Sequence, residues 1–547
     1  MRKNILYFLF MSMSLVSCSL DERPIDFTQK DDFYKSNDDL IMSVNSCYNV
    51  LSHEQYYGNQ FTSAIFCSAD YGEGNTGQNS VQQFTRGELT GEHLILKNIW
   101  AQIYKGIARA NSVIYYSEKA EDVNPVLKSR VIGEAKFIRA LNYFNLVQCF
   151  GEVPLRLQPV LDFDKDEKLE LASKQSILEQ IVSDLVYAEA NCWNREEKRE
   201  GFVNEVGRVT SLAATTLLAK VYLYMATVGR IANDPNFKDG DFPGIHKDFS
   251  GYSNYDEYYT LCKEACERGI SHKDFAMEED WADLWNVTTN KNPKEYIFAI
   301  QYSNETGYGN RLPFLFLPRQ CVLGGSRSSQ GGVNRFVLEF VNLRTLDTDN
   351  NYRWNNGFVL NVEYRDGTKP EDWRWNTAGK GFYFITGTNT QGKGGGKNKL
   401  SLKKWNDPAT SSEASSSCDL PILRSVDLYL MLSECKAELA QNPANGYADI
   451  NAARQRLAGI PEINDTYLDG FEGETPMEKF RNLILRERLQ EFAGEGDRYF
   501  TLLRMGKYIS ECKKVVAKGN GAKVRTLDNY YWPISQDEVA ANTGNVK

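Results

Sequence analysis

The stretch from Gly133 to Leu155, GEAKFIRALNYFNLVQCFGEVPL, decides the fold of this chain. Small and apolar side chains recur along it at the spacing of one helix face: Ala135, Ile138, Leu141 and Phe144. Gly151 stands where the end of a helix requires a positive φ, and Pro154 prevents the helix from continuing. The spacing therefore predicts a helix over 125–149 that packs closely against its neighbours and ends in a tight turn.

Apolar residues recur with the same period on both sides of this stretch. The expected helices cover 31–51, 92–119, 125–149, 173–191, 208–228 and 255–269, and then 424–441, 444–457 and 477–505. Successive helices with short connections favour antiparallel pairs stacked side by side, as in tetratricopeptide arrays, with one concave wall for a partner. No 34-residue repeat is visible in the sequence, so the array is a prediction about structure alone.

The expected fold class is mainly α, with a tetratricopeptide-like scaffold of helical pairs and a large loop-rich insertion that contains short strands. Five segments follow: a signal peptide at 1–17, an extended leader at 18–30, an N-terminal helical scaffold at 31–270 with ligand-side loops at 54–90, a loop-rich, aromatic-rich ligand-binding region at 271–420, and C-terminal helices at 421–547 that complete the same fold. Short strands are expected at 296–302 and 382–385.

The N-terminus has the features of a bacterial lipoprotein signal. Arg2 and Lys3 precede an apolar run that is too short to span a bilayer, and Leu15-Val16-Ser17-Cys18 places small residues before a cysteine. We expect Cys18 to become the first mature residue and to carry lipid; an ordinary secretory signal with an incidental cysteine is the alternative. No later apolar run of membrane-spanning length is expected.

Composition argues against several classes of function. The formal net charge is −9, and removal of the signal would make it more negative, which disfavours nucleic acid as a partner. The cysteines beyond Cys18 are scattered, the four histidines are far apart, and neither Cys-x-x-Cys nor His-Glu-x-x-His occurs. We expect buried structural thiols and no cofactor.

Two loop motifs fail when their chemistry is examined. The segment from Gly387 to Gly394 approaches a phosphate-binding P-loop, but Gly394 replaces the hydroxyl residue that coordinates magnesium. The segment from Asp347 to Asn351 resembles the start of a calcium loop, but its sixth position is Tyr352 instead of glycine. A structural calcium ion held in another geometry stays open.

Acidic and basic residues alternate near the C-terminus: Glu487, Arg488, Glu491, Glu495 and Arg498. A glycosidase needs two carboxylates across a cleft, whereas carboxylates interleaved with arginines favour a structural ion-pair network. No Gly-x-Ser-x-Gly motif is present, so the sequence gives catalysis no positive support.

Aromatic side chains beside amides and charges in polar loops are the candidate ligand contacts. Sugar rings pack flat C–H faces on aromatic rings, and their hydroxyls bond to neighbouring polar groups. The alternative for each ring is that it covers the small core of the insertion. The candidates are Asp70, Tyr71, Asn75, Tyr302, Tyr308, Tyr352, Trp354, Asn355 and Trp375.

Four segments in order resemble the SusD/RagB family of Bacteroidetes outer-membrane nutrient-binding lipoproteins. They are Gly133–Leu155, Gly207–Thr210 leading into Leu217–Leu223, Leu423–Glu434, and Glu487–Arg498. The acidic Ser19-Leu20-Asp21-Glu22 also resembles the stretch that marks surface-exposed lipoproteins of Bacteroidetes. The resemblance spans nearly the whole mature chain.

The resemblance implies a non-enzymatic, lipid-anchored protein at the outer membrane, facing the cell exterior. It would capture a glycan or oligosaccharide and deliver it to a SusC-like TonB-dependent transporter. A peptide ligand, a surface-anchored glycan hydrolase and a helical-repeat assembly protein are the alternatives.

Overall fold

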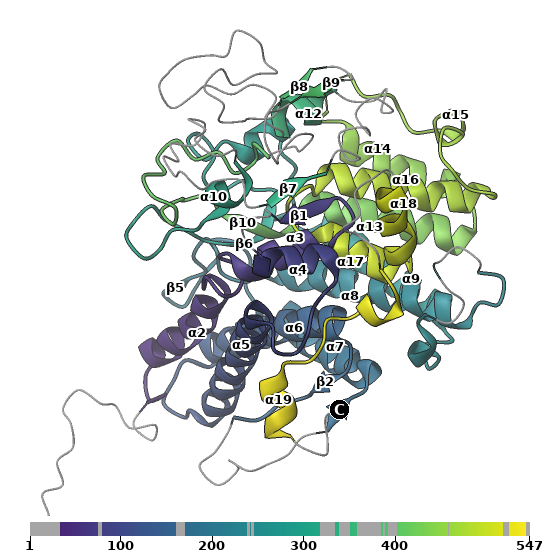
Figure 1. The fold of residues 1–547 in the computed structure, drawn as a ribbon. Helices are drawn as coiled ribbons and strands as arrows, with labels where there is room; N and C mark the ends of the chain where they lie inside the picture. The colour runs from purple at the N-terminus through teal and green to yellow at the C-terminus, as the bar shows by residue number, and fades with distance from the viewer. Residues whose placement is uncertain are drawn as a thin grey trace, which may run out of the picture.

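The computed structural model describes residues 33–74, 79–159, 170–237, 241, 245–317, 334–337, 351–357, 384–386, 389–391, 402–457, 459–517 and 525–542. Helices dominate these residues (Figure 1). The long helices are α2 (Asn37–Leu51), α5 (Leu94–Lys119), α6 (Pro125–Phe150), α7 (Lys174–Asn191), α8 (Ser211–Asn233), α9 (Tyr255–Ile270), α13 (Ser425–Ala440), α14 (Ala444–Arg454) and α16 (Pro476–Glu491). The mainly helical fold class is thereby confirmed.

Successive long helices pack side by side as expected of a tetratricopeptide-like array. Contacts run in order from α5 to α6, α7, α8 and α9, then to α13 and α14. The chain leaves this array after α9 and returns to it at α13, so the segment between them is an insertion between neighbouring helices. Shorter helices complete the C-terminal part: α15 (Asp465–Leu468), α17 (Asp497–Arg504), α18 (Tyr508–Ala517) and α19 (Gln536–Ala541).

Helix α6 lies at the centre of the array. The Asn124 side chain accepts bonds from the first backbone N–H groups, Pro125 opens the helix, and Gly151 ends it with φ 78°. Almost every residue from Val131 to Phe150 is buried, so the helix is enclosed on all sides rather than along one stripe.

Helix α8 is also enclosed, and it corrects one expectation from the sequence. By length and composition it is apolar enough to cross a membrane, although no later run of that kind was expected. Within the protein, 94% of its most apolar 18-residue window is buried. A central helix surrounded by other helices needs the same all-round apolar composition as a membrane span.

The segment 54–90 contains helices and a strand instead of the expected long loops. They are α3 (Gln60–Ser68), β1 (Gly72–Gly74) and α4 (Asn79–Arg86). Aromatic residues in this segment are buried against other core rings, since Phe61 and Phe84 both pack on Trp532. Several of the residues that suggested loops lie within these elements: Gln60 in α3, Gly72 and Gly74 in β1, and Asn79, Gln82 and Gln83 in α4.

Paired short strands join the insertion to the scaffold. β6 (Tyr296–Ile300) pairs antiparallel with β10 (Leu420–Arg424), which spans the expected boundary at 420, and β1 pairs with β7 (Asn334–Phe336). Beside β6, the rings of Trp281, Trp285 and Trp405 pack edge to face in a buried cluster. The remaining elements are α10 (Leu312–Phe316), α12 (Asn351–Gly357), the hairpin of β8 (Phe384–Thr386) with β9 (Asn389–Gln391), and the scaffold hairpins of β2 (Val153–Pro154) with β3 (Leu171–Ala172) and β4 (Lys198–Arg199) with β5 (Phe202–Val203).

The C-terminal segment crosses back over the N-terminal helices, and Figure 1 shows α19 near α5. The Trp532 backbone N–H donates to the Cys149 carbonyl oxygen over 2.7 Å at the end of α6. Lys97 of α5 pairs with Asp537 of α19 at 2.9 Å. The two ends of the described chain are therefore packed into one body.

Candidate ligand-binding site

The nine candidate ligand contacts do not converge on one described site. Asn75, Trp375 and the lipidation residue Cys18 lie outside the described residues, as do the side chains of Trp354 and Asn355 on α12. The candidates whose side chains the structure places are Asp70, Tyr71, Tyr302, Tyr308 and Tyr352.

Asp70 is committed to an ion pair inside the protein. Its carboxylate is 0% exposed and accepts two bonds from the Arg498 guanidinium, at 3.1 and 2.6 Å. Burial opposes the charge of Arg498, but Asp70 and Glu511 hold the pKa of Arg498 above its ordinary value. Tyr71 is half-buried, with its ring 5.6 Å from the same guanidinium. The Asp70–Arg498 ion pair joins the α3–β1 connection to α17, so Asp70 has a structural role.

Two further candidates, Tyr302 and Tyr352, also have partners within the protein. Tyr302 is buried, and its backbone N–H donates to Asp419 over 2.8 Å. The Tyr352 hydroxyl donates to Asp280, and burial together with that carboxylate raises the pKa of Tyr352 to about 12. Tyr302 holds the insertion in place through burial and its backbone, and Tyr352 does so through its hydroxyl, as the alternative for aromatic residues in this region anticipated.

Tyr308 is the exposed candidate, with 67% of its surface open to solvent. It closes a short loop after β6, in which the Ser303 N–H donates to the Tyr308 carbonyl oxygen over 3.0 Å. Asn310 anchors the loop by bonding to Ser416. An exposed ring on an anchored loop can stack on a ligand without losing much conformational freedom.

Tyr308 borders a groove of about 330 Å³, which lies at the lower end of the range for small-molecule sites. Three segments form its walls: the C-terminal half of α2, residues 205–208 before α8, and the β6 strand with Gln301. Apolar surface makes up the larger part of its lining, and several polar side chains stand among it. The residues used below are Asn45, Asn49, Glu205, Arg208, Gln301 and Tyr308.

The open edge of β6 faces this groove. Among the described residues β6 pairs along one edge only, with β10, and Ala299 lies opposite Pro421. The Gln301 side chain, which lines the groove, donates to the Ala299 carbonyl oxygen over 3.5 Å. Gly207 stands above Gln301 with φ 92°, where a Cβ would lie 2.5 Å from Gln301 Cγ. Only glycine permits this close approach.

Glu134, in the stretch that decides the fold, forms the floor beneath the groove. Its buried carboxylate accepts from the Tyr48 hydroxyl over 2.6 Å and from Arg208 over 3.1 Å, and it forms an ion pair with Arg130 at 3.0 Å. Burial and Glu134 both raise the pKa of Tyr48, so its hydroxyl stays a donor. Glu134 and Arg208 come from separate motifs, and no local sequence signal showed that they meet.

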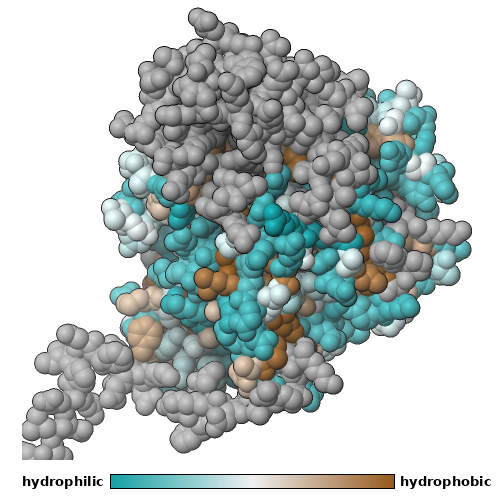
Figure 2. Space-filling model, viewed as in Figure 1, coloured by the Kyte–Doolittle hydropathy of each residue, from teal (hydrophilic) through white to brown (hydrophobic). Residues whose placement is uncertain are grey.

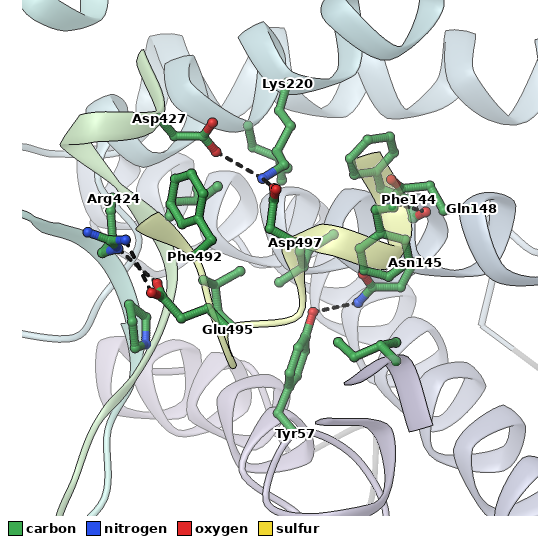
Figure 3. Close-up of a pocket in the computed structure, with 17 residues that line it drawn as sticks. Tyr57, Phe144, Asn145, Gln148, Lys220, Arg424, Asp427, Phe492, Glu495 and Asp497 are labelled. Atoms are coloured by element: carbon green, nitrogen blue, oxygen red, sulfur yellow. Dashed lines mark hydrogen bonds and ion pairs between the residues drawn. The ribbon is translucent and has the colours of Figure 1, made fainter. Parts of the chain in front are cut away.

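A second cavity lies deep between α6, α8, β10 and α17 (Figure 3). Figure 3 shows Lys220 directed toward Asp427 and Asp497, with N–O distances of 2.9 and 3.4 Å. The volume of this second cavity is about 70 Å³. A benzene ring requires about 150 Å³, so this cavity has room for a few water molecules and not for a sugar ring.

The C-terminal carboxylates form the ion-pair network that the sequence favoured. Glu491 contacts Arg353, Arg424 and Arg456, and burial is outweighed by these cations, which hold the pKa of Glu491 well below its ordinary value. Glu487 and Glu495 are paired in the same way, with Arg454 and Arg424. Glu487 and Glu491, whose pKa values are lowered by neighbouring arginines, are therefore poor proton donors for glycoside cleavage.

One serine–histidine contact was not foreseen from the sequence. Ser211 Oγ lies 3.1 Å from His272 Nε2. His272 Nδ1 accepts the Asp274 backbone N–H over 3.1 Å, so the ring proton sits on Nε2 and is donated to Ser211. A ring in this tautomer cannot take the serine proton, as a general base must.

Among the described residues no group of His, Cys, Asp or Glu side chains is arranged to hold a metal ion. The calcium-like segment from Asp347 lies outside the described residues except for Asn351. The nine described cysteines are free and buried, which confirms the expectation of structural thiols. On the face shown in Figure 2, the described surface is mostly hydrophilic, with hydrophobic areas that are small and separated.

The array of paired helices with its inserted strands defines a protein with a tetratricopeptide-like helical scaffold. A family model described as "SusD family" matches residues 294–547, and one described as "Starch-binding associating with outer membrane" matches residues 23–223. The chain belongs to the SusD/RagB family.

Two relatives carry SusD-like names. SusD-like protein P25 of Formosa agariphila is 24% identical over 92% of this chain and 90% of its own length. A SusD-like protein of Bacteroides ovatus is 31% identical over 26% of this chain and 24% of its own length.

Solved structures share the fold. A SusD homolog from Bacteroides thetaiotaomicron superposes with a TM-score of 0.72 at 18% identity, covering 94% of this chain and 96% of its own. Surface glycan-binding protein A from the same organism, solved in complex with laminarihexaose, superposes with a TM-score of 0.66 at 20% identity. The match covers 94% of this chain and 99% of that protein. A laminarin-binding SusD-like protein superposes with a TM-score of 0.66 at 19% identity, and the match covers 93% of this chain and 98% of that protein.

Proposed function

We propose that this protein binds glycans at the cell surface and does no covalent chemistry on them. The observation that carries the proposal is the groove beside Tyr308, where an exposed ring stands next to amide side chains and an open strand edge. An aromatic face for the C–H side of a sugar and several donors and acceptors for its hydroxyls are what carbohydrate recognition requires.

The relatives support a saccharide as the ligand. Two of the similar structures are described as binding laminarin or laminarihexaose, and one family model is described as starch-binding. Tyr71 and the candidates outside the described residues, including Asn75 and Trp375, remain proposed contacts for a longer glycan.

We further propose that Cys18 carries the lipid that anchors the protein in the outer membrane, with the body facing outward. There it would pass its ligand to a SusC-like TonB-dependent transporter, using the helical array as the contact surface. The signal-like N-terminus and the family's description as outer-membrane associated support this placement.

Fractionation of native cells tests this placement. The wild-type protein should remain with outer membranes through a high-salt wash and copurify with a TonB-dependent barrel in mild detergent. Cys18→Ala should be released from the membrane while keeping its fold by circular dichroism. A wild-type protein found in the cytosol, or a Cys18→Ala variant that is retained as firmly as wild type, would contradict the proposal.

A further inference from the structure

We propose that the Tyr308 groove accepts neutral sugar residues and discriminates against residues that carry carboxylate or sulfate. This inference rests on the proposed function and names the class of ligand for the same site. It is drawn from the charges around the groove: the cations named below already bond to protein oxygens, and the exposed charges on the groove and on the Tyr308 loop are acidic.

Arg208 is the one cation among the described residues that line the groove, and each of its three side-chain nitrogens already has a protein oxygen as a partner. Its side chain is 8% exposed and contacts Glu134 at 3.1 Å, Glu205 at 3.0 Å and the Asn45 side-chain oxygen at 3.1 Å. A guanidinium recognises an anionic sugar by offering paired N–H donors to its oxygens. Arg208 already directs its donors to three protein oxygens.

Two arginines close to lining residues also have protein partners. Arg311 bridges Glu54 at 2.9 Å and Glu413 at 3.0 Å. Arg109 donates to the Ser46 carbonyl oxygen over 2.5 Å and to the Asn49 side-chain oxygen over 3.4 Å. An anionic ligand would have to displace these bonds in order to use the same N–H donors.

The exposed charges at the groove are negative. The Glu205 side chain is 70% exposed and lines the groove, and exposed Glu305 lies on the Tyr308 loop. A carboxylate or sulfate brought beside Glu205 would meet a like charge, which lowers affinity. A hydroxyl group can instead donate to Glu205 or bond to the amides of Asn45, Asn49 and Gln301.

The test uses the full mature protein and isothermal titration with matched ligands. The probes are starch, laminarin, xylan and mannan, each neutral, and the C6-carboxylate form of every hexose polymer that binds, with oligogalacturonate and chondroitin sulfate as anionic glycans. We expect a neutral member to bind and its C6-carboxylate form to bind at least about tenfold more weakly. Glu205→Lys should narrow that difference.

Tyr308→Ala should weaken binding of the neutral glycan at least about tenfold, since a stacking ring at the centre of a site contributes much of the affinity. Tyr115→Ala removes a ring from α5 outside the groove and should bind as wild type does.

Three outcomes would overturn the inference. An anionic glycan bound more tightly than its neutral counterpart would overturn the charge argument, and unchanged affinity in Tyr308→Ala would place the glycan elsewhere; both leave the proposed function standing. Absence of binding to every glycan would overturn the proposed function as well.

Discussion

Arg488 illustrates how single residues hold the interior of this protein. Its guanidinium contacts Asp427 at 2.7 Å and Asp497 at 2.6 Å, and all three side chains are buried. Replacing Arg488 by Met would leave two buried carboxylates with only Lys220 beside them. We expect a loss of about 3–5 kcal/mol in the free energy of unfolding, measured by urea titration.

Lys479→Met is the matched control on the same helix, because Lys479 pairs with an exposed carboxylate, Asp469. An exposed pair of this kind contributes at most about 1 kcal/mol. Equal losses in Arg488→Met and Lys479→Met would show that the buried pairs are not important for stability.

His246 should make the protein sensitive to mild acid. The ring is buried against Phe249 and Tyr530, and burial, helped by nearby Lys174, lowers the pKa of His246 to about 4. An unfolded histidine takes up its proton near pH 6.5, so between about pH 6.5 and 4 the unfolded chain binds more protons. The folded state should therefore lose about 3 kcal/mol from this residue as the pH falls through that window.

Urea unfolding of wild type and His246→Gln at pH 7 and pH 4.5 measures this effect. The glutamine variant keeps a polar side chain beside the Leu503 carbonyl oxygen, which His246 contacts at 3.2 Å, but it does not titrate. Its stability should fall less than that of wild type over the same pH range. Parallel losses in the two proteins would assign the acid sensitivity to other groups.

Single-residue roles were the least predictable from the sequence. The alternation of Glu487, Arg488 and Glu491 predicted an ion-pair network, and the structure shows one. Asp70 lay in a loop-like, polar setting that also fits a ligand contact, yet it pairs with Arg498, which is 428 residues away along the chain. Such partners are set by the tertiary fold, which short-range patterns do not encode.

At the scale of elements, apolar periodicity located the long helices, because their buried faces recur with the helical period. The segment expected as one helix over 477–505 is instead α16 and α17. Gly494 and Gly496 both have positive φ between them, and this break lets Asp497 turn back toward Arg488. The short elements in 54–90 were missed because α3 has only nine residues and α4 eight, too few to show a helical period, and α3 is buried on every side.

The start of α16 offers a test of local helix signals. Thr475 accepts from the Glu478 backbone N–H, and the Glu478 side chain returns a bond to the Thr475 N–H, which forms a capping box. Thr475→Ala should lower the free energy of unfolding, measured by urea titration, by about 1 kcal/mol. Exposed Thr466→Ala on α15 is the control and should change stability by less than about 0.5 kcal/mol. An unaffected Thr475→Ala variant would mean that packing alone fixes this helix end.

At the scale of the whole molecule, the scaffold and its insertion are joined at many points. β6 pairs with β10, Arg353 of α12 binds Glu487 of α16, and Trp532 connects the C-terminal segment to α6. The order of helices and the resemblance of four segments were sufficient to predict this fold. The groove could not be predicted, because its three walls come from α2, from residues 205–208 and from β6.

The central claim is that this rigid helical body binds glycans without cleaving them. Titration of the mature protein against a panel of polysaccharides, followed by size analysis of the recovered glycan, tests it most directly. The account predicts saturable binding of at least one glycan, recovered at its original length. Failure to bind any glycan, or recovery of shortened chains, would contradict it.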